Sequence, residues 1–131
     1  MDCIFCKIIK GEIPCYKIYE DDNVISFLDI NPVTKGHLLV IPKKHVIRFK
    51  DLDDNTCIVL FNAIRKILEK VESNVSEHYN ISINQGKFAG QVVEHLHIHI
   101  IPRYEDDGLE MWEGKQLKNI EATELLNKLR C

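Results

Sequence analysis

The chain has 131 residues, of which 45% are hydrophobic and 28% are charged, a composition typical of one globular domain. Its formal net charge is −3, so no overall positive field draws it to nucleic acid or to anionic lipid. No apolar stretch approaches the roughly 18 residues of a membrane span, and we see no signal peptide. We therefore expect a cytoplasmic protein with neither nucleic-acid nor membrane partners.

The predicted elements alternate short strands with helices. In chain order we expect a helical turn over 4–10, strands over 16–19, 24–28 and 37–41, a helix over 60–75, strands over 79–83 and 92–101, and a helix over 121–129. The longest helix repeats its apolar residues at three- and four-residue steps. This order predicts a single α+β domain over 1–131 with a five-stranded, mostly antiparallel sheet, a core over 3–104 and a C-terminal tail over 105–131.

The most distinctive segment is His95-Leu-His97-Ile-His99, which holds half of the chain's six histidines. On a strand, the three imidazoles would share one face at roughly 6 to 7 Å spacing, while the intervening apolar residues enter the core. Imidazoles at this spacing can hold one phosphate. The alternatives are ordinary surface or core histidines and a three-histidine zinc site, although neighbouring imidazoles on a straight strand rarely converge on one ion.

Beyond this triad, the chain resembles the histidine triad (HIT) superfamily of nucleotide hydrolases and transferases along nearly its whole length. The matching segments are Cys3-Ile-Phe-Cys6, Phe27-Leu-Asp29-Ile-Asn-Pro32, Lys35-Gly-His37 through His45, Asn84-Gln-Gly86 and Ala89-Gly-Gln91 through His95. They are most similar to histidine triad nucleotide-binding proteins of the bacterial and lower-eukaryotic type, which carry an N-terminal Cys-x-x-Cys. The resemblance implies the HIT-like fold.

The resemblance also implies a hydrolase that cleaves at the α-phosphate of a purine nucleotide conjugate and releases AMP. His97 would be the nucleophile and form a nucleotidyl-histidine intermediate, with His37, His99 and Gln91 around the reacting phosphate. The implied nucleotide-binding residues are Ile4, Phe5, Phe27, Asp29, Ile30, Asn84, Gly90, Gln91, His97 and His99. Two rival functions stay open: a purine-nucleotide-binding regulator with incidental catalysis, and a metal-dependent hydrolase that uses the triad as ligands.

Several of these residues also have a purely structural interpretation. Asp29 precedes Asn-Pro and is typical of a turn cap, and His37 could simply begin a strand. Phe5 and Phe27 could belong to the core. Each assignment therefore depends on the pattern as a whole.

A zinc site is the second function that the sequence suggests. Cys3 and Cys6 form a Cys-x-x-Cys pair, which in a reducing compartment indicates either zinc or thiol redox chemistry. Redox pairs favour a helix start that follows a strand, and no strand precedes this pair. The resemblance implies that His45 and His95 complete a structural zinc site, which would remove His95 from phosphate binding.

Two departures from the phosphoramidate-cleaving branch leave the substrate open. Val92 stands where that branch has a serine near the leaving group, and the chain continues past Arg103 in a longer tail. The leaving group could be an amine or the remainder of a dinucleoside polyphosphate. The family resemblance and a possible edge strand over 79–83 lead us to expect a homodimer in which the tail reaches the partner's nucleotide site.

Overall fold

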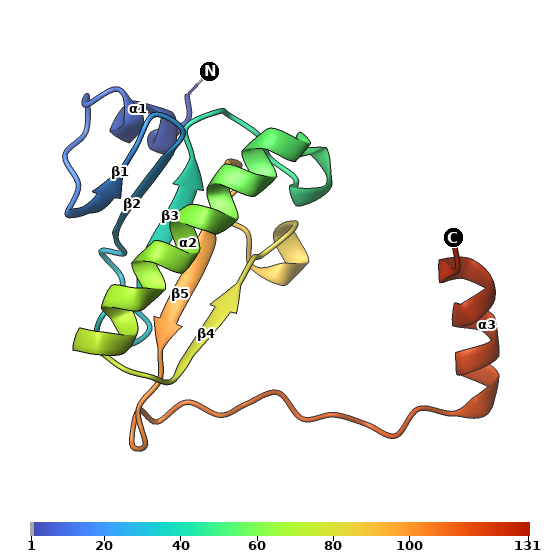
Figure 1. The fold of residues 1–131 in the computed structure, drawn as a ribbon. Coiled ribbons are helices and arrows are strands. Elements are labelled where there is room, and N and C mark those ends of the chain that lie inside the picture. Colours follow the sequence, from blue (N-terminus) through green and yellow to red (C-terminus); the bar gives the residue numbers. More distant parts are fainter. Residues whose placement is uncertain (1) are drawn as a thin grey trace.

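The computed structural model describes residues 2–131, and its centre is a five-stranded antiparallel sheet (Figure 1). The elements are α1 (Ile4–Ile9), β1 (Lys17–Glu20), β2 (Val24–Leu28), β3 (Leu38–Pro42), α2 (Asp54–Asn74), β4 (Tyr79–Ser82), β5 (Ile98–Pro102) and α3 (Asn119–Leu129). The strand order is β1-β2-β3-β5-β4, and every neighbouring pair is antiparallel. The predicted α+β class, the sheet and the three helices are confirmed.

The long helix α2 covers one face of the sheet. Its start is set by Asp53, whose side chain accepts a hydrogen bond from the Thr56 N–H at 2.7 Å, which caps the first turn. The Lys44 ammonium and the Thr56 amide hold the pKa of Asp53 well below its usual range. The apolar face of the helix packs on the sheet through Leu60 and Ile64, among others.

Alternation along the central strands produces a separate apolar layer on each side of the sheet. Beneath α2 lie the sheet residues Val24, Leu38, Val40, Ile98 and Ile100 with the preceding Leu96. On the opposite side, Cys3 and Phe5 pack against Ile25, Phe27, Leu39 and Ile41. Of the helices in the described residues, the short α1 is the one that packs on this second side, beside Cys15 and Val93, and this leaves room for a pocket.

The predicted strand over 92–101 begins too early. The structure places β5 at Ile98–Pro102, so His99 is the one triad histidine in a regular strand. Before Ile98, the carbonyl of His95 accepts a hydrogen bond from the ring of His97, and the chain departs from the strand path. As a result, the His97 and His99 ring centroids lie 4.9 Å apart, closer than the strand spacing predicts.

The core side of that alternation is nevertheless as predicted. Leu96, Ile98 and Ile100 are each no more than 1% exposed. Burial of these apolar side chains fixes the direction of the intervening histidines even where the strand pairing has ended.

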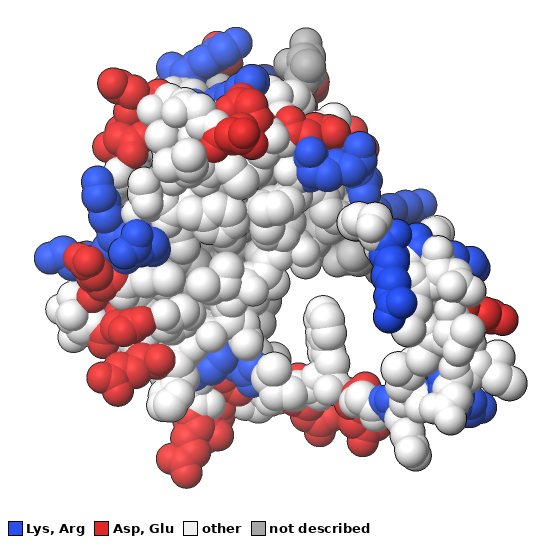
Figure 2. Space-filling view, turned by 45° about the vertical axis from the view of Figure 1, so that its right-hand side comes forward, with Lys and Arg blue, Asp and Glu red and all other residues white. Residues whose placement is uncertain are grey.

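The C-terminal tail extends away from the sheet and ends in α3, which stands apart from the rest of the molecule (Figure 1). The apolar residues Ile120, Leu125, Leu126 and Leu129 of α3 are between 45% and 77% exposed. Figure 2 shows open space between the tail and the body, and acidic and basic side chains mixed around an uncharged central surface. Among residues 2–131, no helix combines the length and apolar character that crossing a membrane requires.

Candidate active site and metal centre

A cavity of about 470 Å³ opens on the α1 side of the sheet. Most of the predicted nucleotide-site residues lie on its wall: Ile4, Phe5, Phe27, Asp29, Ile30, His37, Gly90, His97 and His99. They come from α1, the end of β2, the loop that follows it, the loop before His95, the approach to β5 and β5 itself. The wall is mostly apolar, with its histidines gathered at one part of it, which is typical of a small-molecule site.

Two predicted residues are not on this wall. The side-chain oxygen of Gln91 accepts a hydrogen bond from the Gly86 N–H at 2.9 Å, and its amide donates to the Val93 carbonyl at 3.2 Å. The Asn84 amide lies close to Gly90, where an added Cβ would be 3.5 Å from it. In this structure the Gln91 side chain supports the loop over 85–93 and the Asn84 side chain lies beside it. Their predicted contacts with nucleotide stay predictions.

The sequence reasoning missed several wall residues. The wall also includes Ile8, Ile13, Cys15, Leu39 and Val93. Two of these carried a usable signal: Ile8 follows Ile4 by one helical turn, and Leu39 pairs with Phe27 across β2 and β3.

The ring of His97 is held in one tautomer. Its Nδ1 lies 2.7 Å from the main-chain oxygen of His95, and because a carbonyl can only accept, Nδ1 must carry the hydrogen. In the neutral ring, the lone pair is then on Nε2. The Phe5 ring packs edge-on at 5.1 Å between centroids and restricts the imidazole from the side. This arrangement suits a nucleophile.

A chain of hydrogen bonds likewise fixes His37 and His99. The Val33 N–H donates to Nδ1 of His37 at 3.0 Å, so the His37 hydrogen is on Nε2, 2.9 Å from Nδ1 of His99. His99 must then carry its hydrogen on Nε2. In the described part of the chain, this atom is the buried side-chain nitrogen or oxygen that has no hydrogen-bond partner. The residue that carries this unpaired donor lines the cavity.

Electrostatics favour the neutral form of the His37 and His99 rings. Burial lowers the pKa of His37, although the Asp29 carboxylate at 3.6 Å opposes this shift. Burial, with smaller contributions from His97 and His37, lowers the pKa of His99 to about 4. Both imidazoles are therefore neutral at pH 7, as the hydrogen-bond chain requires.

The second cluster consists of Cys3, Cys6, His45 and His95, whose ligand atoms all lie within 4.8 Å of one another. The His95 Nε2–H donates to the Pro42 carbonyl at 2.8 Å, which leaves the lone pair of Nδ1 turned toward the other three residues. Such a hydrogen bond behind a histidine ligand is common at metal sites, where it fixes the tautomer.

The spacing within this cluster suits a tetrahedral zinc ion. Nδ1 of His95 lies 3.5 Å and 3.6 Å from the two cysteine sulfurs and 3.1 Å from Nδ1 of His45. The Cys6 sulfur is 3.3 Å from the same His45 nitrogen. Ordinary zinc–sulfur and zinc–nitrogen bond lengths place neighbouring ligands about 3.3 to 3.8 Å apart. The four residues therefore fit a closed structural zinc site.

Asp29, His37 and His99 also lie within 4.8 Å of one another, but the tautomers oppose metal binding there. A metal on Nε2 of His37 would move the ring hydrogen to Nδ1, where it would face the Val33 N–H donor. A hydrogen-bond relay suits this cluster better than a metal ion does.

Comparison with known proteins matches the family model of the HIT domain to residues 10–106. An uncharacterized HIT-like protein of Methanocaldococcus jannaschii is 47% identical over 98% of this chain and 98% of its own. An adenosine 5'-monophosphoramidase of Schizosaccharomyces pombe is 45% identical over 79% of this chain and 75% of its own. An adenylylsulfatase of Arabidopsis thaliana is 40% identical over 98% of this chain and 68% of its own.

Solved structures show the same fold. A HIT family member from Bacillus subtilis superposes with a TM-score of 0.90 at 40% identity, covering 98% of this chain and 95% of its own. A zinc-bound histidine triad family protein from Mycobacterium smegmatis superposes with a TM-score of 0.76 at 36% identity, covering 96% of this chain and 90% of its own.

Proposed function

Because the chain belongs to the HIT family, we propose that it is a nucleotide hydrolase that cleaves purine nucleotide conjugates at the α-phosphate and releases AMP. The observation that carries the proposal is the fixed tautomer of His97, which leaves Nε2 unprotonated on the wall of an apolar pocket. Relatives named adenosine 5'-monophosphoramidase and adenylylsulfatase support the reaction class.

In the first step, Nε2 of His97 attacks the α-phosphorus. A nitrogen–phosphorus bond forms, the bond from phosphorus to the leaving group breaks, and the leaving group departs with the electron pair. The Nε2–H of His99 donates to a phosphate oxygen as negative charge grows there. His37 acts behind His99, because its own Nε2–H is already directed to the His99 ring.

In the second step, a water oxygen forms a bond to the phosphorus of the nucleotidyl-His97 intermediate, and the water releases a proton to the solvent. The nitrogen–phosphorus bond breaks, AMP leaves, and the imidazole returns to its starting state. The leaving group of the first step takes its proton from water, since the side chain of Val92 at the pocket mouth has no hydroxyl.

The pocket favours a leaving group with little negative charge. No lysine or arginine lies on its wall among the described residues, and Asp29 adds a carboxylate. A polyphosphate chain would find no cation there, whereas an amine needs none. We therefore place nucleoside phosphoramidates ahead of dinucleoside polyphosphates as substrates.

Zinc has a structural role in this proposal. Cys3, Cys6, His45 and His95 would hold the ion and fasten the N-terminus to the sheet, leaving no open position for chemistry. The zinc-bound neighbour supports this assignment. Since thiolate ligands persist in a reducing compartment, we place the protein in the cytoplasm.

We further propose a homodimer. A helix of α3's length is marginal in isolation, and its apolar residues are exposed in the single chain. The strand β4 lies at one edge of the sheet, where a second copy can pair with it. A dimer with two-fold symmetry could bury the apolar residues of α3 and pair the edge strand β4 in one interface.

Intermediate trapping tests the reaction. The protein is mixed with adenosine 5'-phosphoramidate, denatured at neutral pH and analysed by mass spectrometry. We expect one added adenylyl group, mapped to the peptide that contains His97, with AMP as the product. Turnover without this adduct would exclude the covalent route. Saturable AMP binding without turnover would instead support the nucleotide-binding regulator.

A further inference from the structure

The tautomer of the His37 ring depends on the backbone of the loop that precedes this residue. The Val33 N–H donates to Nδ1 of His37 at 3.0 Å, which places the His37 hydrogen on Nε2, the nitrogen that faces His99 and the Asp29 carboxylate. Val33 itself is 52% exposed, so its own side chain does little to fix the loop. Some other contact must hold the Val33 amide in place.

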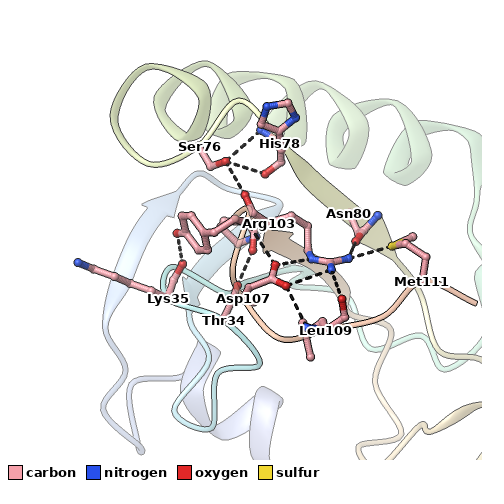
Figure 3. Close-up of polar contacts among 11 residues, drawn as sticks. Thr34, Lys35, Ser76, His78, Asn80, Arg103, Asp107, Leu109 and Met111 are labelled. Atoms are coloured by element: carbon pink, nitrogen blue, oxygen red, sulfur yellow. Dashed lines mark hydrogen bonds and ion pairs between the residues drawn. The ribbon is translucent and has the colours of Figure 1, made fainter.

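Two side-chain hydrogen bonds join this loop to the end of β5. The Thr34 hydroxyl donates to the Pro102 carbonyl at 2.6 Å, and the Tyr104 hydroxyl donates to the Lys35 carbonyl (Figure 3). Thr34 is buried, with 8% of its surface exposed. Both bonds cross from the residues beside Val33 to a segment far away in the sequence.

That segment is itself firmly held. The Arg103 guanidinium donates to both Asp107 oxygens and to the side-chain oxygen of Asn80, while the Arg103 carbonyl accepts from the Ser76 hydroxyl (Figure 3). The Asp107 side chain is only 6% exposed. The end of β5 therefore provides a rigid support for the loop.

Gly36 brings the loop still closer to this support. Its φ of +92° is one that residues with a side chain rarely adopt, and an added Cβ would lie 3.2 Å from the Pro102 ring and 3.0 Å from Val75. The close approach of the loop to Pro102 keeps the Thr34 bond short.

We infer that Thr34 and Tyr104 are positioning residues for His37. They hold the loop so that the Val33 N–H selects one His37 tautomer, and through it the position of the hydrogen on His99, a residue of the pocket wall. They touch no substrate themselves. The catalytic consequence rests on the proposed function, whereas the tautomer assignment does not.

Long-range nitrogen–proton NMR of the histidine rings tests the inference directly. In the wild type we expect His37 to show the pattern of a single Nε2–H tautomer. In Thr34→Val, which keeps the shape and removes the hydroxyl, we expect a mixture of tautomers at His37 and an altered His99 signal. Thr34→Ser, which restores a hydroxyl, should return the wild-type pattern, and Tyr104→Phe should give a smaller change.

Thr56→Val is the matched control, because Thr56 is a buried threonine remote from the loop. It should leave the His37 pattern unchanged even if it lowers stability. A folded Thr34→Val protein with the wild-type His37 pattern would overturn the inference, as would an equal change in the control.

Kinetics provide the second measurement. If the proposed hydrolysis is correct, Thr34→Val should lower kcat about tenfold with KM changed less than twofold, since misplaced groups cost rate more than binding. An inactive wild type with the expected tautomer pattern would refute the proposed function alone. A kcat unchanged in Thr34→Val beside an active wild type would refute the positioning role.

Discussion

The His97 ring donates from Nδ1 to the main-chain oxygen of His95, at 2.7 Å. The ring of His95 faces the cysteine pair, so a proposed zinc ligand directly supports the ring that lies on the proposed nucleotide pocket. The two sites are thus neighbours along one short piece of backbone, and each can be tested with its own substitution.

Replacement of His97 by asparagine should separate chemistry from binding. We expect kcat to fall by about a thousandfold or more, because the nucleophile is lost. AMP affinity, measured by calorimetry, should change only a few-fold, because Asp29 and His99 remain on the pocket wall. Turnover near the wild-type rate would contradict the covalent mechanism.

Chelation should affect stability more than activity. With zinc removed from Cys3, Cys6, His45 and His95, we expect Tm to fall by roughly 10 °C. Differential scanning calorimetry measures the Tm, and the metal content is determined in parallel. The hydrolysis rate at 25 °C should stay within a few-fold, because the attacking group is an imidazole. Activity that tracked the metal while folding was unchanged would favour a metal-dependent hydrolase.

Stability should decrease in mild acid. The pKa of His99 is lowered to about 4 in the folded protein from an ordinary 6.5, so the folded state favours the neutral ring. The contribution of the neutral His99 ring to the free energy of unfolding is complete above pH 6.5 and is lost as the pH falls toward 4. Urea unfolding between pH 7 and pH 4.5 should show this slope.

His99→Gln isolates that contribution, since glutamine does not titrate. We expect its unfolding free energy to fall less steeply than that of the wild type over the same range. His78→Gln, at an exposed histidine, should keep the wild-type slope. Equal slopes in all three proteins would show that His99 does not carry the effect.

Light scattering should return a mass of about 30 kDa, twice the 15.2 kDa of the chain. Glutamate at Leu126 and Leu129 should weaken this dimer at micromolar concentration, because charged residues would then occupy the apolar side of α3. Lys128→Glu on the same helix is the control and should leave the mass unchanged. A monomeric wild type would contradict the homodimer.

The sequence predicted best those elements whose periodicity is long or whose ends carry turn residues. The strand β2 was predicted at Val24–Leu28, as found, because Asp29 and the following Asn-Pro end it. The body of α2 was predicted from its apolar repeat. The start of β5 was not, because the alternation over 95–97 comes from burial of Leu96 and not from strand pairing.

Within the candidate site, residue types were predictable and hydrogen-bond partners were not. The triad predicted a phosphate-binding cluster, and the cysteine pair with two histidines predicted a metal-binding one. The role of the Val33 amide could not be predicted, since a main-chain N–H has no signature in a sequence. The direction of Gln91 depends on the local path of the loop over 85–93, which the alternation of apolar residues does not specify.

The interleaving of His95, His97 and His99 with buried apolar residues also limits how this stretch can evolve. Deleting or inserting one residue would exchange the two sides of the backbone. Imidazoles would enter the core, leucine and isoleucine would face the pocket, and the metal ligand would be displaced at the same time. Point substitutions can change one of these features alone, whereas a change of length would change all of them together.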